Sequence, residues 1–86
     1  MIHKDTVPLS KLPVGSLGRV ADLKLDGLLR RRVLDLGMVP GTPVECVRKS
    51  PSGDPTAYQV RGATIALRNE NAEQITVSRI QIVNED

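Results

Sequence analysis

The stretch Leu36-Gly37-Met38-Val39-Pro40-Gly41-Thr42 decides the fold of this chain, because it ends one regular element and begins another. Gly37 predicts the end of a helix, since helices commonly stop at a left-handed residue that only glycine adopts at low cost. The Pro40-Gly41 pair then supplies a turn that leads into a strand. Of the two residues in between, Met38 or Val39 is expected to fold back onto the helix, and the other to point away from it.

The residues on either side of this stretch predict one helix and several short strands. Asp26 can cap a helix that runs to Leu36, on which Leu29, Val33 and Leu36 form an apolar stripe at helical spacing. Alternating apolar residues, divided by glycines and prolines, predict strands at residues 16–23, 43–49, 57–60, 63–68 and 75–82, with a bulge near residues 78–79. Short helical turns are expected at residues 8–12 and 69–74.

These elements predict a mostly β fold. They fit a small antiparallel barrel of about five strands, with the helix as a lid and one or two short helical turns. Gly37, Pro40, Gly41 and Gly62 are expected to be turn residues that serve the fold. A chain of 86 residues fits a single domain over residues 1–86, of which residues 1–6 are expected to be flexible.

The composition narrows the classes of function. The hydrophobic share is 40%, but Tyr58 is the only aromatic residue, so the core must be built from aliphatic side chains. The single cysteine, Cys46, excludes an internal disulfide and is expected to be a buried apolar residue. No segment approaches the roughly 20 apolar residues of a membrane-spanning helix, and the N-terminus lacks the pattern of a secretory signal. We therefore expect a cytoplasmic protein.

Several separated motifs, in a fixed order, carry a resemblance to a known family. They are the helix with residues 36–42, the turn Pro51-Ser52-Gly53-Asp54-Pro55, the pair Arg61-Gly62, the segment Ile65-Ala66-Leu67-Arg68, Ala72, and the segment Ile75-Thr76-Val77. On these motifs the chain resembles the bacterial ferrous iron transport protein A (FeoA) family over most of its length. The resemblance implies a cytosolic SH3-like module that assists the membrane transporter FeoB, which carries its own GTPase domain, at the inner face of the membrane.

The sequence contains no recognisable set of catalytic residues. His3 is the only histidine and Cys46 the only cysteine, and the acidic residues are scattered, so neither a nucleophile with its base nor an acidic pair can be assembled. A divalent metal needs three or four converging ligands, so we expect no required cofactor and no enzymatic activity. The exception is Met1-Ile2-His3, whose amine, amides and imidazole can chelate Cu(II) or Ni(II); the alternative is a disordered terminus, and a metal at His3 would be adventitious.

The candidate partner-binding residues are apolar side chains expected at the surface and their charged neighbours: Leu28, Arg31, Arg32, Met38, Val39 and Asp54. Leu28 lies about 100° around the helix from Leu29, and methionine is common at adaptable binding surfaces. The arginines would form a positive rim for an acidic partner, and Asp54 lies in a stiff hairpin tip. Each has a structural alternative: core packing for Met38 and Val39, a solvated helix face for the arginines, and a well-made turn for Asp54.

A nucleic-acid-binding barrel is the main alternative from another class. It would use the basic residues Arg30, Arg31, Arg48, Lys49, Arg61 and Arg79. The net charge of only +2 and the shortage of aromatic residues argue against it, because stacking on aromatic rings supplies much of the affinity for single strands. A regulatory module like the C-terminal domain of metal-dependent repressors, and weak self-association through an open strand edge, are further alternatives.

Overall fold

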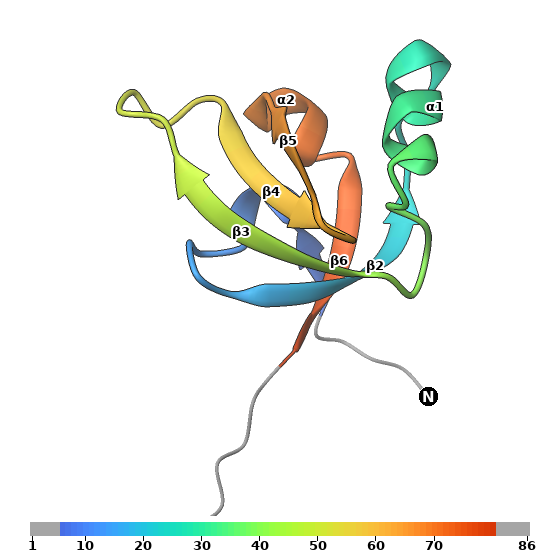
Figure 1. Cartoon of the computed structure of the whole chain (residues 1–86), viewed down its shortest axis with the longest axis horizontal. Helices are drawn as coiled ribbons and strands as arrows, with labels where there is room; N and C mark the ends of the chain where they lie inside the picture. Colours follow the sequence, from blue (N-terminus) through green and yellow to red (C-terminus); the bar gives the residue numbers. More distant parts are fainter. Residues whose placement is uncertain (1–5, 81–86) are drawn as a thin grey trace, which may run out of the picture.

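One antiparallel sheet of six strands, in the order β1-β6-β2-β3-β4-β5, forms the body of the molecule (Figure 1). The computed structural model describes residues 6–80. Its elements in chain order are β1 (Thr6–Pro8), the 3-10 turn η1 (Leu9–Lys11), β2 (Leu17–Leu23), α1 (Gly27–Asp35), β3 (Pro43–Lys49), β4 (Thr56–Val60), β5 (Ala63–Leu67), α2 (Asn69–Ala72) and β6 (Ile75–Ile80).

The predicted fold class is confirmed, with one strand more than expected. The additional strand is β1, which pairs along its whole length with residues 76–78 of β6. Of residues 1–6, which were expected to be flexible, Thr6 belongs to this strand and residues 1–5 lie outside the described range. A strand of three residues is too short to show an alternating pattern, so it is defined only by its tertiary partner.

The two edges of the sheet differ. β1 is one edge, with only three residues, and its last residue, Pro8, has no N–H to offer to a further strand. β5 is the other edge; it has five residues and contains no proline. Within residues 6–80 no strand pairs with the outer side of β5, which makes it the more open edge.

Two β-bulges bend the sheet, but not at the expected place. The register shifts between Val20 and Asp22 in the β2–β6 pair, and between Cys46 and Arg48 in the β3–β4 pair. The bulge expected near residues 78–79 is wrong, because these residues pair regularly with β2.

The barrel interior is aliphatic, as the composition predicts. Every second residue of β4 is buried, and in β5 Ile65 and Leu67 are the buried residues, which is the period of a strand with one face in a core. Tyr58 is 1% exposed, and its hydroxyl donates a hydrogen bond to the Leu9 carbonyl oxygen over 3.4 Å. Cys46 is fully buried beside these residues, as expected.

Helix α1 matches the predicted helix closely. Val33 is fully buried, and Leu29 and Leu36 pack against the core from half-buried positions. Asp26 occupies the N-cap position, but its side chain makes no capping hydrogen bond. The two predicted helical turns correspond to η1 and α2. Among residues 6–80 there is no helix with the length and apolar character needed to span a bilayer.

Candidate partner-docking site

Leu28 is the most exposed large apolar side chain of residues 6–80, with an exposed fraction of 86%. It lies in the first turn of α1, where the neighbouring Leu29 starts the stripe that packs on the core. Successive helical residues are rotated by about 100°, so Leu28 is turned to solvent. The predicted exposure of Leu28 is confirmed. Burying such a side chain against a partner would contribute roughly 2 kcal/mol.

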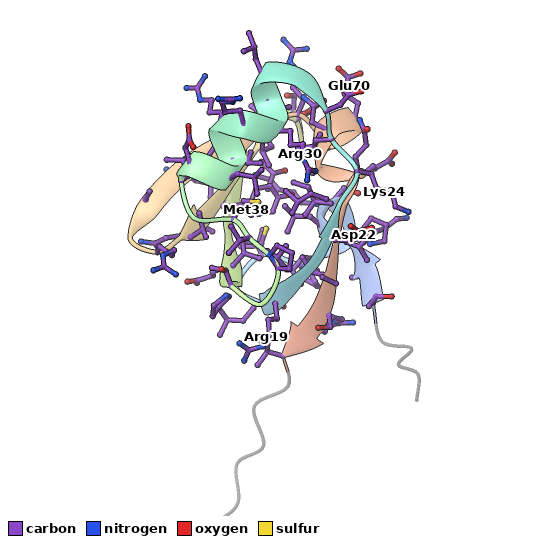
Figure 2. All side chains as sticks on the ribbon, turned by 90° about the vertical axis from the view of Figure 1, so that its right-hand side faces the viewer. Arg19, Asp22, Lys24, Arg30, Met38 and Glu70 are labelled. Atoms are coloured by element: carbon purple, nitrogen blue, oxygen red, sulfur yellow. The ribbon has the colours of Figure 1, made fainter. Side chains whose placement is uncertain are left out.

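The run of arginines on α1 contains one anchored and two exposed side chains. Arg30 Nη1 donates hydrogen bonds to the carbonyl oxygens of Leu23 (3.0 Å) and Leu25 (3.4 Å), in the segment that enters the helix (Figure 2). Arg30 therefore fixes the start of α1. Arg31 and Arg32 are exposed, three and four residues after Leu28, and so on its side of the helix. We call Leu28, Arg31 and Arg32 the α1 patch.

Met38 is fully buried, so the prediction that it binds a partner is wrong. The Gly37 N–H donates to the Leu34 carbonyl oxygen (2.9 Å) and the Met38 N–H to that of Val33 (3.0 Å), which together define a Schellman motif. This motif returns the second residue after the helix onto the last turns, and Figure 2 shows Met38 on the inner side of α1. Of the two candidates, Val39 is the one that points away, with 38% exposed.

Val39 does not join the α1 patch. Leu28 lies in the first turn of α1 and Val39 follows the C-cap residue Leu36, and a helix of nine residues is about 13 Å long. The Val39 N–H also donates to the Gly37 carbonyl oxygen over 2.8 Å, which holds it in the turn below the helix. Val39 is therefore an apolar surface residue separate from the α1 patch, and it is less exposed than Leu28.

Asp54 lies on the other side of the molecule from α1, at the tip of the β3–β4 hairpin (Figure 1). Its Oδ1 accepts the backbone N–H of Asn69 over 3.0 Å, and Asn69 Nδ2 donates to the Gly53 carbonyl oxygen over 3.3 Å. Asp54 is thus an N-terminal cap of α2 supplied from another part of the chain. It does not lie with the other predicted partner-binding residues, and its carboxylate has a structural role.

The predicted turn residues are confirmed by their backbone angles. Gly37, Gly41 and Gly62 have φ values of 104°, 97° and 83°, and Pro40 precedes the second of them. Arg61, with φ of 50°, stands before Gly62 in a two-residue β4–β5 connection, so both loop residues have positive φ, as in a type I′ turn. The Arg61 side chain lies directly over Gly37, where a Cβ atom would overlap Arg61 Cδ.

We expect Gly37→Ala to lower the free energy of unfolding by about 2 kcal/mol, measured by urea denaturation. The positive φ disfavours alanine, and the new methyl group would displace Arg61, whose Nε would lie 3.1 Å from it. In an Arg61→Ala background the same substitution should cost less, by at least about 0.5 kcal/mol. Equal costs in both backgrounds would contradict the contact between Arg61 and Gly37.

An open groove beside α1 was not indicated by the sequence. Its volume is about 420 Å³, and it is lined by Leu29, Arg32 and Leu36 of α1 and by Thr64, Ile65 and Ala66 of β5. We call it the β5 groove. The alternation of β5 shows which side chains are buried, but only the strand order shows that this strand is an edge next to the helix. No local pattern in the sequence carries that information.

The basic residues of the nucleic-acid alternative are dispersed. Arg30 binds two carbonyl oxygens, while Arg48 and Lys49 lie near the β3–β4 hairpin, which is on the side of the molecule away from α1 (Figure 1). Arg61 lies against Gly37, and Arg79 is in β6. A nucleic-acid backbone binds a contiguous basic stripe, and this arrangement does not supply one.

The described residues hold no evident catalytic or metal-binding group. Among residues 6–80 no three His, Cys, Asp or Glu side chains converge, and His3 lies outside that range. Burial raises the pKa of the Cys46 thiol, so this side chain stays protonated and unreactive.

A curled antiparallel sheet of six strands with one main helix defines a small SH3-like domain. The family model of the FeoA domain matches residues 7–79, and the chain belongs to the FeoA family. The family that the sequence resembled is thereby confirmed.

A curated relative and two solved structures illustrate this membership. The Fe(2+) transport protein A/Fe(2+) transporter FeoB fusion protein of Porphyromonas gingivalis is 32% identical over 72 residues, which are 84% of this chain but 8% of that protein. The solution structure of FeoA from Chlorobium tepidum is 33% identical, with a TM-score of 0.83 over 87% of this chain and 71% of that one. Stenotrophomonas maltophilia FeoA in complex with zinc, a prokaryotic SH3 domain protein, is 34% identical, with a TM-score of 0.70 over 81% and 87% of the two chains.

Proposed function

We propose that this chain is an accessory protein of ferrous iron uptake that docks onto the transporter FeoB at the cytosolic face of the membrane. The observation that carries the proposal is the joining of a related domain to FeoB in the Porphyromonas gingivalis fusion protein. Two parts of one chain meet at a high effective concentration. A domain with this task needs a surface that holds the transporter.

The α1 patch is the surface best suited to this task. Leu28 offers an apolar anchor with 86% of its surface available, and a few such anchors dominate most interfaces. Arg31 and Arg32 lie beside it and would speed the encounter with an acidic surface. Arg30 holds the first turns of α1 to the end of β2 and to the segment that follows it, so the anchor is presented on a rigid element.

The proposed role is non-catalytic and needs no cofactor. It is supported by the burial of the only thiol, which keeps this side chain from acting as a nucleophile. The protein would act by occupying a position on the transporter. Its effect on nucleotide hydrolysis, on transporter assembly or on recruitment of a third protein would follow from that position.

The test is capture of detergent-solubilised FeoB from the same organism by the immobilised protein, with and without GTP. Leu28→Gln should weaken capture at least about tenfold, because a buried leucine contributes 1.5–3 kcal/mol at roughly 1.4 kcal/mol per factor of ten. The matched control is Val14→Gln, an equally polar change at a residue that is 53% exposed, in the turn before β2 across the molecule from α1 (Figure 1). The control should bind like the wild type.

Two results would count against the proposal in different ways. If folded Leu28→Gln captured FeoB as well as the wild type, the α1 patch would not be the docking surface. If the wild type captured no FeoB in either nucleotide state, docking onto this transporter would be wrong.

A further inference from the structure

The β5 groove has an open strand edge along one wall. β5 is the last strand in the sheet order, and α1 stands beside it and contributes the other wall of the groove. Thr64 and Ala66 of β5, both exposed, line the groove together with the buried Ile65. The wall therefore consists of main chain and small side chains, which allow another backbone to approach closely.

The hairpin geometry shows which backbone groups of β5 face this groove. Val60 and Ala63 flank the two-residue turn, so they form a hydrogen-bonded pair. Hydrogen-bonded and non-hydrogen-bonded pairs alternate along an antiparallel ladder. The pairs of Thr64 with Gln59 and of Ala66 with Ala57 are consequently non-hydrogen-bonded. The N–H and C=O groups of Thr64 and Ala66 therefore point away from β4, at the edge that no other strand in residues 6–80 covers.

The remaining features of the groove select the chemistry of an occupant. Leu29, Leu36 and Ile65 give it an apolar lining, and Arg32 adds the only charged side chain. Arg61 and Arg68 flank β5 in the sequence and add positive charge at its two ends. A helix is about 10 Å wide and satisfies its own backbone groups, so it would leave those of Thr64 and Ala66 unused. An extended segment with a carboxylate fits each of these features.

We propose that β5 receives an extended acidic segment of FeoB as an additional strand. The segment donates and accepts main-chain hydrogen bonds with Thr64 and Ala66, directs apolar side chains toward Leu29 and Leu36, and places an Asp or Glu carboxylate on Arg32. This is strand addition, in which the backbone gives affinity and the side-chain pockets give specificity. The inference rests on the proposed function and adds a second contact to the one made by Leu28.

Hydrogen exchange gives a direct test with the unmodified protein. The ¹⁵N-labelled chain is exchanged alone and in complex with detergent-solubilised FeoB, then quenched, released and examined by NMR. The amides of Thr64 and Ala66 should exchange quickly in the free protein and at least about tenfold more slowly in the complex. The amide of Ile65, which already pairs with Tyr58 of β4, should be slow in both states and serves as the internal reference.

Paired variants separate backbone contacts from side-chain contacts. Of the backbone hydrogen-bonding groups, Thr64→Pro removes only an outward-facing N–H, so the β4–β5 hydrogen bonds remain. It should weaken FeoB binding about tenfold. Thr64→Val keeps the N–H and should bind like the wild type. Arg32→Glu should weaken binding about tenfold or more, whereas the same charge change at Arg48, in β3, should leave binding unchanged.

The outcomes distinguish this inference from the proposed function. FeoB binding with fast exchange at Thr64 and Ala66 would overturn strand addition and leave docking through the α1 patch intact. If Thr64→Pro and Thr64→Val weakened FeoB binding equally, FeoB would recognise the side chain of this residue and not its backbone. Absence of any FeoB binding by the wild type would overturn both proposals together.

Discussion

Met38→Asp is expected to lower the free energy of unfolding by at least about 4 kcal/mol and to leave much of the protein unfolded at 37 °C. Truncating a buried methionine already costs about 2 to 5 kcal/mol, and an unpaired carboxylate in an apolar interior adds a desolvation cost. Met38 is fully buried within the one hydrophobic core of the described chain. Domains of this size are stable by only about 5 to 15 kcal/mol, so the loss would dominate a thermal melt followed by circular dichroism.

Met38→Leu is the matched control for this prediction. It preserves apolar character and nearly the same volume, so it should cost less than about 1.5 kcal/mol. A Met38→Asp protein that melts with the wild type would contradict the burial of this side chain. It would also restore Met38 as a candidate for partner binding, because only a solvent-exposed methionine tolerates a charge.

Between pH 10 and pH 12 the free energy of unfolding should fall by roughly 2 kcal/mol through the ionisation of Tyr58. Burial raises the pKa of Tyr58 from 10.0 to about 12 in the folded protein. A raised folded-state pKa means that the folded protein favours the neutral phenol. Its stabilisation is complete below pH 10 and is lost as the pH rises through 12, because the unfolded chain has already released its proton.

The measurement is denaturant unfolding at several pH values, together with the ultraviolet absorbance of tyrosinate in the folded protein. Tyr58 is the only tyrosine and the chain has no tryptophan, so this absorbance reports one residue. Tyr58→Phe provides the contribution of all other groups as a background and should give a flatter profile. A tyrosinate transition centred near pH 10 in the folded protein would contradict the buried environment of Tyr58.

The positions where helices end and turns begin in this fold were predictable, because they depend on local chemistry. Gly37 ends a helix and Gly41 follows Pro40 in a turn regardless of what surrounds them, and the structure confirms both. The same holds for the alternation of β5 and the apolar stripe of α1, which depend only on the period of each element. Leu28 followed from this stripe as the residue rotated out of it.

The features that sequence reasoning missed depend on partners distant in the chain. β1 exists because it lies beside β6, and the cap on α2 comes from Asp54, which is 15 residues away from the N–H that it binds. Met38 required a choice between two neighbours that only the Schellman hydrogen bonds decide. The β5 groove required the strand order, which no periodicity encodes.

The unequal edges of the sheet limit the stoichiometry of any assembly built on strand addition. Within residues 6–80, β1 is three residues long and ends in Pro8, whereas β5 offers two residues with outward-facing backbone groups. Once a segment occupies β5, the described sheet has no equivalent second acceptor. Within residues 6–80, strand addition therefore has one favoured acceptor, which favours a one-to-one complex over a filament. If two copies paired with each other, each would use its β5 edge, and the result would be a closed dimer.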